Sequence, residues 1–224
     1  MTDASQAVRA GGFWLVAASF CMIIVLLVHG PIDPDPTAQM AKIASHPLRW
    51  AVVHWIAAAG LSLFAIVGLI LLTSHSHLTD GFWRLTAWAV ISMGAFWTMT
   101  TAVAEATVIT TAAVGGTTET FTSWWAFAEG KAIGFAVLAL GIALVGSNEA
   151  REPTGATPAW SAWVATAAGV ASFLGWALGM WLEIRPANLL WVVASVTMCL
   201  WTLWFGMALR RVPHGEMGTV LRAA

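Results

Sequence analysis

A chain of 224 residues in which 59% are hydrophobic and only 9% are charged is not an ordinary soluble domain, where charged residues make up about a quarter. Its net charge of −1 at pH 7 favours neither nucleic acid nor an acidic partner. We therefore expect an all-α polytopic membrane protein whose residues 1–224 form one domain in the lipid bilayer. The chain has 15 Trp and no Tyr, so Trp alone must supply the interfacial aromatic belt.

Six apolar segments reach the length of about 20 residues that a membrane-spanning helix needs. They cover approximately residues 12–29, 50–73, 83–109, 121–146, 158–183 and 187–209. On one side of these spans fall Arg9, Arg84, Arg151, Arg210, Arg211 and Arg222, and on the other Lys42, Arg49 and Arg185. Because basic residues concentrate on the inner side, we expect both termini in the cytoplasm and the protein in the inner (plasma) membrane.

Two connections on the outer side have distinct patterns. The stretch PIDPDPTAQMAKIASHP predicts a short helix in which Asp35 is the N-cap and Pro36 the first helical residue. Met40, Ile43 and Ala44 would share one face, so this helix is expected to lie on the outer membrane surface. Between the third and fourth spans, TTAAVGGTTETFTS predicts a mobile Thr/Gly-rich loop.

Several spans carry a narrow stripe of small or polar residues at helical spacing, and small residues let membrane helices approach closely. The third span has Gly94, Thr98, Thr101 and Glu105, the fifth has Ala171, Gly175, Gly179 and Glu183, and the sixth has Ser195, Cys199, Thr202 and Gly206. We expect these stripes to face other helices rather than lipid.

The fourth span contains two charges, Glu129 and Lys131, and charged residues in a membrane helix are costly unless they have a partner or a function. Two residues apart on a helix is about 200°, so the two side chains point to opposite sides. Glu129 shares its side with small residues and is expected to face the interior. Lys131 shares its side with bulky apolar residues and is expected to reach toward the outer headgroups or to form an ion pair.

Ionisable residues from separate spans gather at one outer level, although the spans alternate in direction. They are His29, His54, Glu105, Glu129 and Glu183. Two imidazoles with one or two carboxylates suit a divalent transition metal such as zinc, iron or copper. We therefore predict a polar pocket near the outer (periplasmic) membrane face that binds a metal ion or a small polar ligand and is catalytic or redox-active. His29, His54, Glu105 and Glu129 are the predicted metal ligands. Lys131 and Glu183 are predicted to orient or pair with these ligands.

This prediction depends on shared depth, since the chain has no His-Glu-x-x-His motif and no Cys ligand set. Alternatives therefore stay open. A haem b held by His29 and His54 is one. A proton- or ion-coupled transporter using Glu105 and Glu129 is another, although the inner half carries few ionisable residues. A third is a non-catalytic subunit that docks onto other membrane proteins or onto a second copy of itself.

Overall fold

The computed structural model describes all residues except 1, 34, 131–132 and 212–224. The side chains of residues 2, 3, 129 and 130 also lie outside the description. In the described part of the chain every regular element is a helix. The α-helices are α1 (Thr2–Val28), α2 (Pro36–Ser45), α3 (Pro47–Leu72), α4 (Phe82–Ala104), α5 (Thr110–Gly115), α6 (Thr118–Trp125), α7 (Gly134–Arg151), α8 (Ala159–Trp176) and α9 (Arg185–Leu209). A 3₁₀ turn, η1, covers His77–Thr79, and three π-helical segments are η2 (Glu105–Ile109), η3 (Ala126–Gly130) and η4 (Ala177–Trp181).

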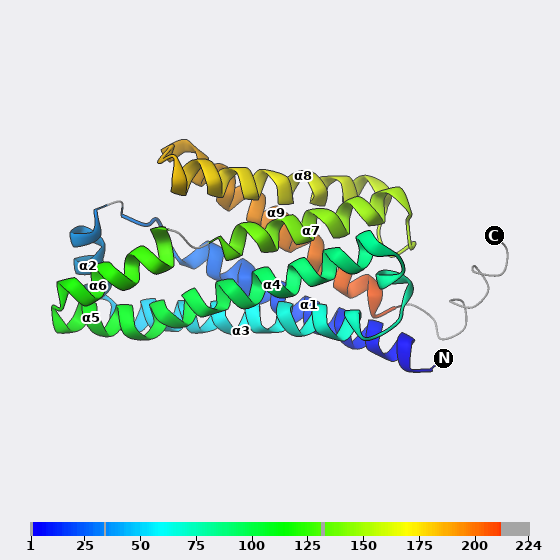
Figure 1. The fold of residues 1–224 in the computed structure, drawn as a ribbon, viewed down its shortest axis with the longest axis horizontal. Coiled ribbons are helices and arrows are strands. Elements are labelled where there is room, and N and C mark those ends of the chain that lie inside the picture. The colour runs from blue at the N-terminus through cyan, green and yellow to red at the C-terminus, as the bar shows by residue number, and fades with distance from the viewer. Residues whose placement is uncertain (1, 34, 131–132, 212–224) are drawn as a thin grey trace.

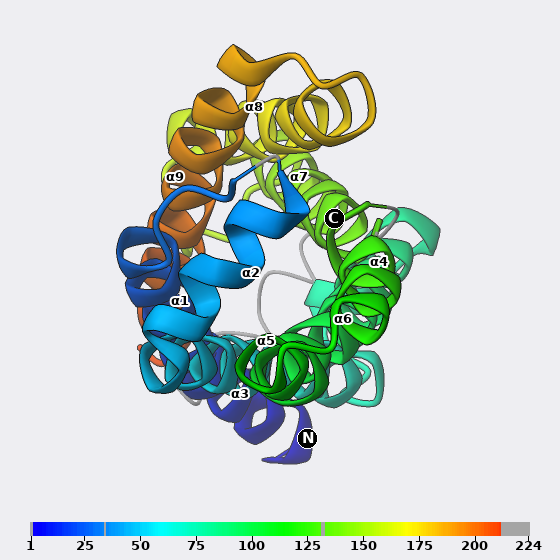
Figure 2. The ribbon, with the colours of Figure 1, turned by 90° about the vertical axis from the view of Figure 1, so that its left-hand side faces the viewer.

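The long helices α1, α3, α4, α7, α8 and α9 form a closed ring (Figures 1 and 2). Each packs against the long helix before it and the one after it in the chain, and α9 closes the ring by packing against α1. Five helical stretches are long and apolar enough to cross a membrane: Ala4–Val28, Pro47–Leu72, Phe82–Gly115, Ala159–Trp181 and Arg185–Leu209. The all-α membrane bundle predicted from composition and span length is thus confirmed.

Two predicted segments differ from the structure. The span predicted at 121–146 is split into α6 with η3 and the separate helix α7, which begins only at Gly134. The predicted Thr/Gly-rich loop is also wrong, because it forms α5 and α6, joined at Gly116 with a φ of 68°. Its apolar face explains the helices: Ala112 and Phe121 belong to a small buried cluster with Ile43 of α2.

The short helix α2 begins as predicted, with the Asp35 carboxylate accepting a hydrogen bond from the Thr37 backbone N–H at 3.0 Å. It crosses one end of the ring (Figure 2), where it packs on α5 and α6. Gln39 and Ile43 are its buried residues, whereas Ala44, predicted to share that face, is exposed. We call the end covered by α2, α5 and α6 the capped end, and the opposite end, where the N-terminus lies, the terminal end (Figure 1).

Glycines set the closeness of the helix pairs, as the small-residue stripes predict. A Cβ on Gly94 of α4 would overlap the backbone of Leu138 on α7. A Cβ on Gly141 of α7 would lie 2.8 Å from the backbone nitrogen of Ile91 on α4. The α4–α7 contact therefore has no room for even a methyl group at these positions.

We expect Gly94→Ala to lower the free energy of unfolding by about 1–3 kcal/mol, because the new methyl group must push α4 away from α7. Thermal unfolding of the detergent-solubilised protein measures the change. Gly115→Ala is the matched control, because a Cβ there meets nothing within 4 Å. Equal stability of the two variants would show that α4 and α7 are not in close contact at Gly94.

Candidate metal site

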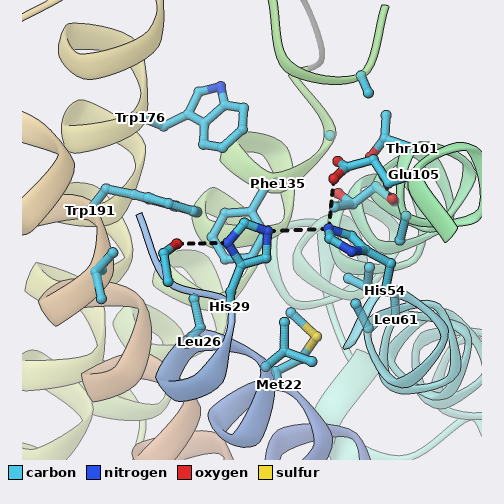
Figure 3. Close-up of a pocket in the computed structure, with 18 residues that line it drawn as sticks. Met22, Leu26, His29, His54, Leu61, Thr101, Glu105, Phe135, Trp176 and Trp191 are labelled. Atoms are coloured by element: carbon cyan, nitrogen blue, oxygen red, sulfur yellow. Dashed lines mark hydrogen bonds and ion pairs between the residues drawn. The ribbon is translucent and has the colours of Figure 1, made fainter. Parts of the chain in front are cut away.

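Three of the predicted ligands meet near the capped end, and each comes from a different part of the ring (Figure 3). His29 directly follows α1, His54 lies on α3, and Glu105 begins the π-helical segment after α4. The His29 Nε2 and His54 Nε2 atoms are 3.2 Å apart, and His54 Nε2 is 2.6 Å from Glu105 Oε2. One ligand atom from each residue lies within 4.8 Å of the other two.

Backbone carbonyls fix the orientation of both imidazole rings. His29 Nδ1 lies 2.9 Å from the Gly30 carbonyl oxygen, and His54 Nδ1 lies 2.8 Å from that of Trp50. A carbonyl only accepts, so both Nδ1 atoms must carry the proton that is donated. A neutral imidazole held in this way turns its Nε2 lone pair toward the cluster, which is the orientation that metal-binding histidines show when a carbonyl holds the other ring nitrogen. A protonated His54 instead donates its Nε2–H to Glu105 Oε2 at 2.6 Å.

The cluster consequently brings together two imidazole nitrogens and a carboxylate oxygen, and His54 Nε2 and Glu105 Oε2 are at ion-pair distance. Acceptors at such distances repel one another unless a cation, either a proton or a metal ion, lies between them. Donors bound at about 2.0–2.2 Å to one metal ion are themselves separated by roughly 3.0–3.5 Å. The 3.2 Å separation of the two Nε2 atoms falls in this range, whereas the 2.6 Å between His54 Nε2 and Glu105 Oε2 is an ion-pair length. A metal ion would replace the proton of this pair, with an outward shift of Glu105.

Two of the three side chains are shielded from solvent, whereas His29 is half-buried. His54 is 3% exposed and Glu105 is 5% exposed. The Trp50 ring packs against both imidazoles, with its centroid 5.0 Å from that of His29 and 4.5 Å from that of His54. His29 lies just beyond the spanning helix α1, and desolvation, together with the positive charge of a protonated His54, lowers its pKa to about 4, so its imidazole is neutral at pH 7.

A cavity of about 120 Å³ adjoins the three residues and is lined from all six helices of the ring. On the α3 and α4 side the lining includes Thr98 and Thr101 together with the apolar Ala57, Leu61 and Ala102. On the opposite side Phe135, Trp176 and Trp191 form an aromatic wall (Figure 3). An ion held by the three residues would thus have free space next to it, large enough for a few water molecules or a small ligand.

The π-helical segments occur at this level of the ring. Glu105 is the first residue of η2, Ala128 of η3 lines the cavity, and Trp176 directly precedes η4. The Thr110 hydroxyl donates to the Glu105 carbonyl oxygen at 2.7 Å and so satisfies the backbone where the helical pattern changes. Such segments are frequent at functional sites, because the extra residue in the turn shifts the side chains that follow.

The other predicted site residues have different positions. Glu129 belongs to η3 by its backbone, but its side chain lies outside the described residues, as does the whole of Lys131. Glu183 is exposed at the turn before α9, with a φ of 55°, and does not line the cavity. The aromatic wall was not predicted, although Thr98 and Thr101 could be inferred from the stripe they form with Glu105.

Comparison with known protein families, characterised proteins and solved structures finds no match to this chain. The chemistry of the cluster is therefore the guide to function. Two imidazoles and one carboxylate hold zinc in some hydrolytic sites and iron in some oxygenases, and in both cases positions on the ion stay open for water or substrate.

The tautomers can be measured by nitrogen-15 NMR of the histidine-labelled protein. We expect Nδ1 of both His29 and His54 to carry a proton at pH 7, because each donates to a backbone carbonyl. Spectra of His29→Gln and His54→Ala would assign the two signals. An unprotonated Nδ1 on either residue would contradict the orientation described above.

Proposed function

We propose that this protein is a membrane-embedded metalloprotein in which His29, His54 and Glu105 bind one divalent transition metal ion, zinc, iron or copper, near the outer membrane face. The observation that carries the proposal is the convergence of two imidazole Nε2 atoms and a carboxylate oxygen, with both Nδ1 atoms engaged by backbone carbonyls. Direct metal ligation would use three protein atoms and leave coordination positions open toward the cavity.

An open position distinguishes catalytic from structural metal sites, which are usually closed by four protein ligands. The cavity supports a site that acts on a ligand, either by activating a bound water molecule or, with iron or copper, by a redox reaction. Glu129 is proposed as a further ligand or as a base acting on metal-bound water, because Ala128 of the same π-helical segment lines the cavity.

The same geometry favours a bare ion over haem b. In a haem with two histidine ligands the iron and its macrocycle lie between the two nitrogens, so these must be about 4 Å apart, with apolar space for the whole ring around them. Here the nitrogens are 3.2 Å apart, and the adjoining cavity of about 120 Å³ is well below the roughly 300 Å³ of the smallest common ligand pockets.

Metal content tests the proposal. Elemental analysis of the purified wild-type protein should find about one transition-metal ion per chain, and Glu105→Gln and His54→Ala should each lose most of it, because each removes one of three ligands. The matched controls are Glu119→Gln and His46→Ala, since both residues are exposed and lie outside the cluster.

The two pairs of variants should behave differently while all four remain folded by circular dichroism. Loss of metal in the control variants as well, or its retention in Glu105→Gln and His54→Ala, would show that the ion binds elsewhere. A Soret band in the absorption spectrum of the same sample would show that the protein binds haem rather than a bare metal ion.

A further inference from the structure

The cavity beside the metal ligands has an opening, and the exposure of its lining residues shows where. Most lining residues are buried. Those with exposed surface are Leu26, His29 and Gly30 at the end of α1, Trp191 and Val192 on α9, and Thr98 on α4. The opening therefore lies mainly between α1 and α9, and we call Leu26, His29, Gly30, Trp191 and Val192 the α1–α9 portal.

Contacts between the two helices explain why they separate only at the capped end. Near the terminal end, a Cβ on Gly12 of α1 would lie 2.7 Å from the Gly206 carbonyl oxygen of α9. Midway along the helices, the hydroxyls of Ser19 and Thr202 share a hydrogen bond of 2.8 Å. The helices α1 and α9 are thus in contact at Gly12 and Gly206 and again at Ser19 and Thr202, and they separate only beyond these contacts, at the portal.

The portal extends from the end of the span Ala4–Val28, which His29 and Gly30 follow, to a deeper level at Val192. Val192 lies seven residues into α9 from Arg185, which corresponds to about 10 Å along the helix axis. A basic residue at the start of a spanning helix lies at the headgroups, so this depth is below them. The flanking side chains are apolar and outward-facing: Leu27 is 70% exposed, Leu189 is 69% exposed and Val193 is 57% exposed.

Inside the portal, the cavity offers a ligand few polar groups other than the proposed metal ion. The Thr98 hydroxyl donates to the Gly94 carbonyl oxygen and the Thr101 hydroxyl to that of Thr98, each at 2.7 Å. The wall opposite the ligands is aromatic, with Trp191 in edge-to-face contact with both Phe135 and Trp176. At about 120 Å³, the cavity is somewhat smaller than an apolar cavity of about 150 Å³ that accepts benzene.

We propose that the substrate is a membrane-dissolved amphiphile, with one metal-binding oxygen group on an apolar body, that enters from the lipid through the α1–α9 portal. The oxygen group reaches the ion held by His29, His54 and Glu105, while the apolar body lies against the aromatic wall and extends into the portal. This inference rests on the proposed metal-binding function and names the class of molecule on which the ion acts.

Two hydroxamic acids with the same chelating group test this inference in protein reconstituted into lipid nanodiscs and loaded with Co²⁺, whose visible absorption reports ligand binding. Octanohydroxamic acid carries an apolar tail, and acetohydroxamic acid carries one methyl group. We expect the first to bind at least about tenfold more tightly, because roughly two buried methylenes contribute a factor of ten.

The portal is tested by a matched pair of neighbours on α9. Val192→Phe narrows the portal, whereas Val193→Phe places the same ring on the lipid-facing side. Octanohydroxamic acid partitions equally into the lipid of both variants, so this partitioning does not affect the comparison between them. We expect Val192→Phe to weaken octanohydroxamic acid binding about tenfold or more, with Val193→Phe within about twofold of wild type. If Val192→Phe fails to take up Co²⁺, Leu26→Phe narrows the portal from α1.

The outcomes separate the two proposals. Co²⁺-loaded protein that binds both hydroxamic acids equally, or that binds octanohydroxamic acid equally in the portal and control variants, contradicts the lipid-side substrate and leaves the metal site standing. Wild-type protein that takes up no Co²⁺ contradicts the metal site and this inference with it.

Discussion

The site depends on two hydrogen bonds from histidine side chains to the backbone. The carbonyls of Gly30 and Trp50 each accept a hydrogen bond from the Nδ1 of a histidine, and this turns both Nε2 atoms toward the cluster that they form with the Glu105 carboxylate. In a buried site such a convergence of acceptors is costly without a positive charge, since little solvent is present to screen it. A proton between His54 and Glu105, or a metal ion in its place, supplies this charge.

The ring of helices brings this arrangement about. His29, His54 and Glu105 are distant in sequence and become neighbours only because α1, α3 and α4 are consecutive members of an up-and-down bundle. Glycines such as Gly94 and Gly12 allow the close crossings, and the π-helical segments at the capped end change the direction of the side chains at the level of the cavity. Where α1 and α9 separate, the same packing leaves the cavity open on one side.

Much of the fold could be predicted because membrane helices have a simple length and composition rule. The spans predicted at 50–73 and 187–209 agree with α3 and α9 to within a few residues. The prediction of one continuous helix over residues 121–146 was wrong, because apolar composition alone does not show where a helix is interrupted. Glu129 and Lys131 were therefore interpreted as side chains on a single helix. The Thr-rich segment between α4 and η3 was predicted to be a loop but is helical. The packing of Ala112 and Phe121 with Ile43 outweighs the low helix propensity of threonine there.

Depth along the spans was enough to bring His29, His54 and Glu105 into one group, because residues at one level of a narrow bundle lie near one another. Depth does not give rotation about the helix axis, so Glu183 was grouped with them although it is exposed at a turn. The aromatic wall and the portal depend on how the helices tilt and separate, which no local pattern in the sequence encodes.

X-ray absorption at the metal edge tests the central claim most directly, because it reports the atoms bound to the ion. The account predicts nitrogen and oxygen neighbours at about 2.0–2.2 Å, with the outer-atom scattering of two imidazole rings. A shell that contains sulfur, or that shows no imidazole, would contradict the metal site of His29, His54 and Glu105.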